Sequence, residues 1–88
     1  MSIKDVLRYE LIGLPVKIVA SKNTSLVGIE GVIVDETKYL VIIESAGKVK
    51  KILKEQATFH ITFNDRTYEI QGKLLIGRPE ERLKKVRL

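Results

Sequence analysis

Four lysines fall within seven residues in the segment Lys48–Lys54, and ammonium groups so closely spaced can neutralise phosphates. On a β-strand, alternation places three of them on the face that Ile52 shares: Lys48, Lys50 and Lys54. Lys51 then lies near the rim of a barrel, unless a β-bulge at Lys50–Lys51 shifts the register. Both arrangements predict an exposed strip of ammonium groups. An edge strand that lysines protect from aggregation explains the segment equally well.

Two further segments offer groups that suit an RNA backbone. The polar loop Lys22–Ser25 supplies a cation, an amide and two hydroxyls for phosphates or 2′-hydroxyls, although polar loops are common. The C-terminal segment carries a basic cluster, to which Lys73 adds a charge: Arg78, Arg82, Lys84, Lys85 and Arg87. Exposed pairs of its arginines with Glu80 or Glu81 contribute at most about 1 kcal/mol, so they leave the arginines available for a ligand.

Residues that could carry catalysis are few. His60 is the only histidine, and no partner for general-base catalysis can be assigned to it. Asp35 and Glu36 are adjacent, whereas a metal pair needs carboxylates that converge from separate elements. The chain has no cysteine and no Walker-type phosphate loop. We therefore expect no catalytic residue, and no metal or cofactor bound by the protein itself.

The positive charge is unevenly distributed. The 88 residues carry a net charge of +5, with a sequence pI of about 9.6. Residues 1–47 hold five basic and six acidic side chains, a net −1, whereas residues 48–88 hold eleven and five, a net +6. Such a bias indicates a polyanionic partner, although a lysine-rich surface of a heat-adapted protein is the alternative. With few aromatic residues, RNA recognition should depend on phosphate, sugar and shape rather than base stacking.

The N-terminal sequence has no apolar core typical of a signal peptide, and no apolar run approaches the ~18 residues of a membrane span. Together with the absence of cysteine, this predicts a cytoplasmic protein without a membrane partner.

Short apolar segments separated by turn residues predict a single, mainly β domain, a small antiparallel barrel or sandwich. Six strands are expected over residues 16–20, 30–36, 39–44, 48–54, 58–63 and 67–71. Residues 30–36 and 39–44 show little polar alternation, which indicates that both of their faces are covered in places. Gly47 suits a hairpin turn with positive φ, and Gly28 and Gly31 suit a barrel corner.

Helices are predicted on both sides of this domain. Residues 1–12 form the N-terminal helix, residues 15–72 the barrel and residues 77–88 a basic C-terminal helix. An apolar stripe on the first helix could cap the barrel or dock on a partner: Ile3, Val6, Leu7 and Leu11.

Four segments, in this order, resemble the signature of archaeal ribonuclease P protein component 1: Asn23–Thr37, Gly47–Lys51, Ala57–Phe59 and Gly77–Arg82. Each segment is weak alone, but the ordered combination is specific and the similarity runs from about Tyr9 to Lys85. The family pattern has an aspartate where Glu81 stands, so the charge is kept.

The resemblance implies an Sm-like barrel of six antiparallel strands with terminal helices. It implies a non-catalytic subunit of the endoribonuclease that removes the 5′ leader of precursor tRNA, in which the RNA subunit uses Mg²⁺ and holds the catalytic site. The barrel would contact the ribonuclease P RNA, and the terminal elements, with the apolar stripe, would bind protein component 4, a zinc-ribbon subunit. Matching positions give these RNA-contact residues: Lys22, Asn23, Ser25, Lys48, Lys50, Lys51, Arg78 and Arg82.

Two functions from different classes thus remain. The first is an RNA-binding ribonuclease P subunit, and the second is a barrel-type protein-interaction module of the translation or transcription machinery. Charge reversal at the lysines discriminates between them, because it should abolish RNA binding and leave protein binding intact.

Overall fold

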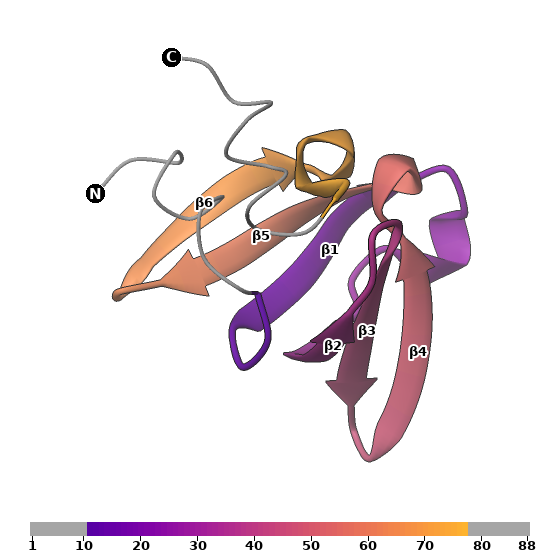
Figure 1. Ribbon diagram of the computed structural model, residues 1–88. Helices are drawn as coiled ribbons and strands as arrows, with labels where there is room; N and C mark the ends of the chain where they lie inside the picture. Colours follow the sequence, from indigo (N-terminus) through magenta and orange to yellow (C-terminus); the bar gives the residue numbers. More distant parts are fainter. Residues whose placement is uncertain (1–10, 78–88) are drawn as a thin grey trace.

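The computed structural model describes residues 11–77, which form one six-stranded antiparallel sheet (Figure 1). In chain order the strands are β1 (Pro15–Ser21), β2 (Glu30–Glu36), β3 (Leu40–Ser45), β4 (Lys48–Leu53), β5 (Ala57–Phe63) and β6 (Arg66–Gln71). They lie side by side in the order β4-β3-β2-β1-β5-β6. The predicted mainly β, six-stranded antiparallel fold is therefore confirmed.

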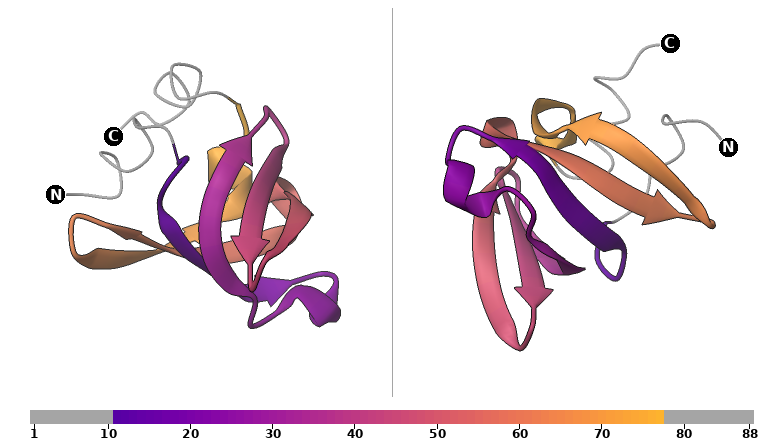
Figure 2. Two further views of the ribbon diagram at one scale, coloured as in Figure 1. Left: turned by 90° about the horizontal axis from the view of Figure 1, so that it is seen from below. Right: turned by 180° about the vertical axis from the view of Figure 1, so that it is seen from behind.

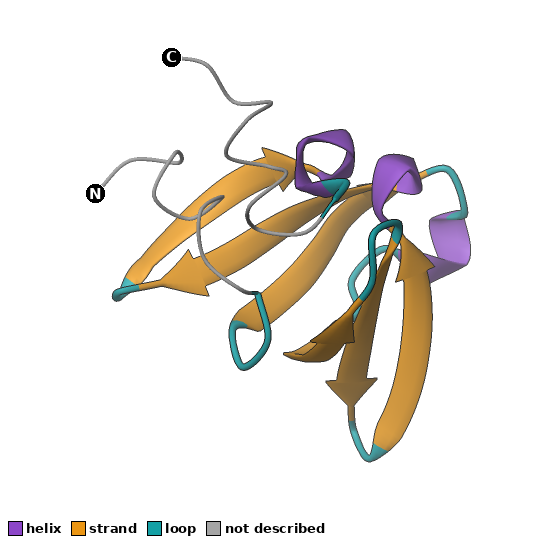
Figure 3. Cartoon of the chain, viewed as in Figure 1, coloured by secondary structure: helices purple, strands orange, loops and turns teal. Residues whose placement is uncertain are grey.

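Three short 3-10 helices connect the strands: η1 (Thr24–Leu26), η2 (Lys54–Gln56) and η3 (Gly72–Leu75). All three lie at the same end of the sheet (Figure 3). Among residues 11–77, no helix is long and apolar enough to cross a membrane. The predicted terminal helices fall almost entirely on residues 1–10 and 78–88, outside the described residues.

Two bulges bend the sheet around its core. Ile18 pairs with Phe59 and Ala20 with Thr58, so Val19 is an extra residue in β1. A second register shift, between Ile33 and Asp35, leaves an extra residue in β2. Because bulges bend strands and increase their twist, β2, β3 and β4 fold over toward β5 and β6 (Figure 2).

The edge strands β4 and β6 are not hydrogen-bonded to each other. Instead, η2 packs against η3 at the end of the sheet where these strands finish. The sheet thus curves as the predicted barrel requires, while short helices rather than a continuous strand ladder connect its two edges.

The core lies inside this curved sheet. Phe59 and Ile61 are fully buried, and His60 between them is partly exposed, as the alternation in β5 predicts. Leu11 is also fully buried and belongs to the core cluster. Leu11 therefore packs into the core, which agrees with the alternative that the stripe caps the barrel, and it is not exposed for a partner. Ile3, Val6 and Leu7 lie outside the described residues.

Turn chemistry matches the sequence at the hairpins. Ala46 and Gly47 have φ angles of 52° and 78°, and Asn64 and Asp65 have φ angles of 50° and 64°. Two consecutive positive φ values are typical of type I′ turns, which suit the twist of antiparallel strands. The predicted positive φ at Gly47 is confirmed.

Gly31 is required for close contact between strands. A Cβ atom at this position would lie 2.1 Å from the carbonyl oxygen of Glu44 on β3. A side chain would therefore force β2 and β3 apart beside the bulge.

The outer face of β2 is more exposed than the expected partial cover of residues 30–36 and 39–44, and so is the outer face of β4 beside β3. Val32 and Val34 on β2, and Val49 and Leu53 on β4, are each 40–58% exposed. No element of the described part of the chain packs over them.

Candidate nucleic-acid interface

The polar loop is held in shape by its own side chains. The Asn23 Oδ1 atom accepts hydrogen bonds from the Ser25 backbone N–H (3.2 Å) and the Ser25 hydroxyl (2.7 Å). This caps the N-terminus of η1, and the Asn23 N–H donates to the Ser21 Oγ atom at 3.1 Å. Asn23 therefore offers RNA only its amide N–H₂ donors, while the Ser25 hydroxyl, whose proton is committed, offers acceptor lone pairs.

Lys22 lies exposed beside this cap. Its backbone N–H donates to the Gln56 carbonyl at 2.9 Å, which attaches the loop to the end of η2. The backbone N–H groups of Lys22 and Asn23 are both hydrogen-bonded, so the Lys22 side chain extends from an ordered backbone.

The three lysines of β4 lie exposed on a regular edge strand. Lys48, Lys50 and Lys51 face Ser45, Ile43 and Ile42 of β3 in an unbroken register. The β-bulge considered for Lys50–Lys51 is therefore absent. Alternation places Lys51 on one face of β4 and the other two lysines on the opposite face, close to the β3–β4 turn.

Lys54 does not belong to the exposed strip. It is the first residue of η2 and is fully buried, as is Ile52 two residues before it. Its Nζ atom donates to the carbonyl oxygens of Thr37 (2.7 Å), Gly77 (3.2 Å) and Lys38 (3.3 Å), and lies 3.5 Å from the Glu36 carboxylate. Burial of an ammonium group requires such partners, so Lys54 is a structural residue rather than an RNA contact.

The structure separates the remaining candidates into two groups. The polar loop lies at the end of the sheet where β4 finishes, and Lys48 lies at the opposite end, by the β3–β4 turn (Figure 1). Six strand residues span roughly 17 to 20 Å, so one RNA segment would have to follow the length of β4 to touch both groups. Arg78 and Arg82 lie outside the described residues.

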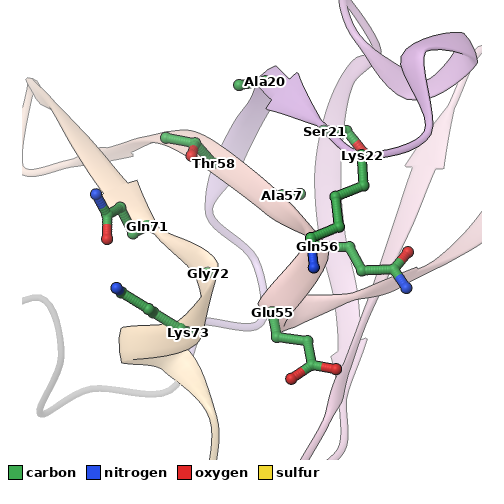
Figure 4. Close-up of a pocket in the computed structure, with 10 residues that line it drawn as sticks. All are labelled: Ala20, Ser21, Lys22, Glu55, Gln56, Ala57, Thr58, Gln71, Gly72 and Lys73. Atoms are coloured by element: carbon green, nitrogen blue, oxygen red, sulfur yellow. The ribbon is translucent and has the colours of Figure 1, made fainter.

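A hollow that sequence reasoning missed lies next to the polar loop. It has a volume of about 360 Å³ and lies between the end of β1, η2 and the start of η3. Lys22 and Gln56 lie on one side of it, and Gln71 and Lys73 on the other (Figure 4). The residues on one side are 15 to 51 positions from those on the other, so no local motif could have indicated the site.

Other charged groups form pairs on the outer surface. The Lys17 Nζ atom lies 3.3 Å from a Glu30 carboxylate oxygen, and the His60 Nε2 atom lies 2.9 Å from a Glu69 carboxylate oxygen. Within residues 11–77, no three histidine or acidic side chains gather in a way that could hold a metal ion.

Comparison with known proteins gives one consistent family. A family model described as ribonuclease P/MRP subunit p29 matches residues 4–85. The chain is 48% identical over 82 residues to ribonuclease P protein component 1 of Methanocaldococcus jannaschii, covering 92% of this chain and 86% of that protein. It is 49% identical over 84 residues to the protein of the same name from Thermofilum pendens, covering 93% and 89%.

A solved structure agrees with these relatives. Mth11, described as a homologue of the human RNase P protein Rpp29, matches with a TM-score of 0.61 and 41% sequence identity. The match covers 84% of this chain and 97% of Mth11. With the six-stranded fold and the match over residues 4–85, the chain belongs to the ribonuclease P/MRP subunit p29 family, which includes the archaeal proteins called ribonuclease P protein component 1.

Proposed function

We propose that this chain is an RNA-binding protein subunit of ribonuclease P, the ribonucleoprotein that removes the 5′ leader of precursor tRNA. The observation that carries the proposal is the family match across residues 4–85, nearly the whole chain. The basic second half, with the exposed lysines of β4, supplies the charge that an RNA-binding subunit needs. The relatives' shared name leaves the interaction module of translation or transcription without support.

Mechanistically, the chain would act on the fold of the RNA rather than on the scissile bond. Ammonium and guanidinium groups neutralise phosphates that RNA must otherwise bring together against their mutual repulsion. The RNA subunit would then fold at lower Mg²⁺ concentration and retain precursor tRNA more strongly. Catalysis would belong to the RNA and its Mg²⁺ ions, with no active site on this protein.

The partners of the chain would be the ribonuclease P RNA, precursor tRNA in the holoenzyme, and protein component 4. We assign protein component 4, the zinc-ribbon subunit, to the terminal segments, including the stripe of Ile3, Val6 and Leu7. The expected compartment is the cytoplasm.

Reconstitution tests the proposal directly. The full chain, with and without protein component 4, is added to ribonuclease P RNA, and cleavage of precursor tRNA is measured at limiting Mg²⁺. We expect cleavage to rise when the full chain is added alone and to reach its maximum when protein component 4 is added with it. Cleavage that the chain leaves unchanged would contradict the proposal, and cleavage by the protein without RNA would contradict the assignment of catalysis to the RNA.

A further inference from the structure

We propose that the hollow between η2 and η3 binds a single unpaired nucleotide of RNA, an inference that rests on the RNA-binding function proposed above. Three observations carry it: the rigidity of the walls, the unused hydrogen-bonding groups that line them, and the placement of the charges.

The walls of the hollow are fixed by backbone contacts. Gly72 is buried, and a Cβ atom there would lie 1.6 Å from the Lys54 carbonyl oxygen and 2.6 Å from that of Ala57. The start of η3 therefore presses directly on η2 and on the start of β5. The hydrogen bond from the Lys22 N–H to the Gln56 carbonyl fixes the opposite wall. A preformed site avoids the cost of ordering its walls when a ligand binds.

The lining offers neutral groups for the edge of a base or for a 2′-hydroxyl. Gln56, Thr58 and Gln71 are among the residues that line the hollow. Within the described part of the chain, none of these three side chains forms a hydrogen bond. Two amides and a hydroxyl can donate and accept in the mixed patterns that base edges and ribose present.

The charged groups favour a nucleotide over a free phosphate. Lys22 and Lys73 approach from opposite sides, so both can reach a phosphate that passes over the opening. Glu55 also lines the hollow and disfavours a phosphate seated inside it, whereas its carboxylate can accept a hydrogen bond from a base amino group or a 2′-hydroxyl.

Among residues 11–77, no aromatic side chain lines the hollow, so these residues offer no ring for a base to stack on. A nucleotide held there is recognised by its edge and its sugar. It must therefore be splayed out of a helix, as in loops and bulges of folded RNA.

The first test detects the site itself. An unstructured five-nucleotide RNA that contains all four bases is titrated into the full-length, ¹⁵N-labelled protein. We expect the backbone amide signals of Thr58, Gly72 and Lys73 to shift, while those of Thr62 and Thr67, toward the far end of β5 and β6, stay in place. Unshifted signals around the hollow at saturating RNA would overturn the proposal.

The second test distinguishes binding in the hollow from the nonspecific electrostatic attraction between RNA and the basic protein. Replacing Gln56 and Gln71 by alanine removes two neutral contacts and no charge, so binding of ribonuclease P RNA should weaken about tenfold. The salt dependence of binding should stay the same, because the number of phosphates contacted is unchanged. The matched control, Thr62→Ala with Thr67→Ala, removes two neutral polar groups from β5 and β6 and should bind as the wild type.

The two proposals fail differently in this experiment. If the wild-type protein does not bind ribonuclease P RNA, the proposed function is wrong. If the wild type binds and the folded double glutamine variant binds equally well, only the nucleotide site is wrong. Thermal unfolding of each variant shows that it is folded.

Discussion

Single residues show where alternation along a strand predicts the structure and where it does not. The sequence correctly grouped Lys54 with Ile52, but it could not show that both side chains are buried or that Lys54 begins η2 rather than ending β4. The reason is that the groups that stabilise the buried ammonium come from the β2–β3 turn and from Gly77. Neither is close to Lys54 in sequence.

At the scale of single residues, the burial of Lys54 gives a prediction for stability. Lys54→Met removes the ammonium group and leaves the carboxylate of Glu36, only 8% exposed, without this partner. We expect a loss of about 3–5 kcal/mol in the free energy of unfolding, measured by urea denaturation. Lys51→Met, at an exposed position of β4, should change it by less than about 0.5 kcal/mol. Equal stability of the two variants would contradict a structural role for Lys54.

Strands were the most predictable elements. The expected and observed strands differ by at most one residue at every boundary, because apolar runs and turn residues are local signals. The bulges in β1 and β2 were not predicted, since a bulge is defined by the partner strand. For the same reason, the sequence could not decide between a regular and a bulged β4 at Lys50–Lys51, which the pairing with β3 settles.

The regular, exposed β4 gives a prediction for RNA affinity. Reversing Lys48, Lys50 and Lys51 to glutamate replaces attraction to phosphates by repulsion, so affinity for ribonuclease P RNA should fall by about two orders of magnitude or more. Filter binding at fixed salt measures the change. Binding to protein component 4 should persist, because we assign it to the terminal segments.

A matched control tests whether position or only total charge matters. Reversing Lys17, Lys38 and Arg66 to glutamate changes the net charge by the same amount at positions outside β4. The β4 variant should lose far more affinity than this control. Equal losses would mean that the lysines of β4 contribute only to the general charge of the protein.

At the scale of the whole molecule, charge was predictable and its arrangement was not. Counting side chains shows the +6 of residues 48–88, but only the fold shows the polar loop and the β3–β4 turn at opposite ends of the sheet. The hollow is likewise a property of the tertiary structure, since three separate stretches of the chain line it: 20–22, 55–58 and 71–73.

Binding of the whole protein to RNA should depend strongly on salt. About five phosphate contacts predict a slope of roughly −4 when the logarithm of the association constant is plotted against the logarithm of salt concentration. Isothermal titration with ribonuclease P RNA at several salt concentrations measures this slope. Affinity that stays nearly constant across the series would contradict phosphate contacts as the main source of binding.

The central position of β1 has a consequence for how the chain folds. The hairpins β2–β3, β3–β4 and β5–β6 join neighbours in sequence, whereas β1 pairs with β5 across 36 to 45 residues. Closing that long loop costs entropy before any contact compensates for it, so the β1–β5 ladder should form after the hairpins and limit the folding rate. During synthesis, one edge of β1 therefore stays unpaired until β5 has left the ribosome. Because the core also includes Ile70 and Leu75, it is complete only after about 85% of the chain, 75 of 88 residues, has been made.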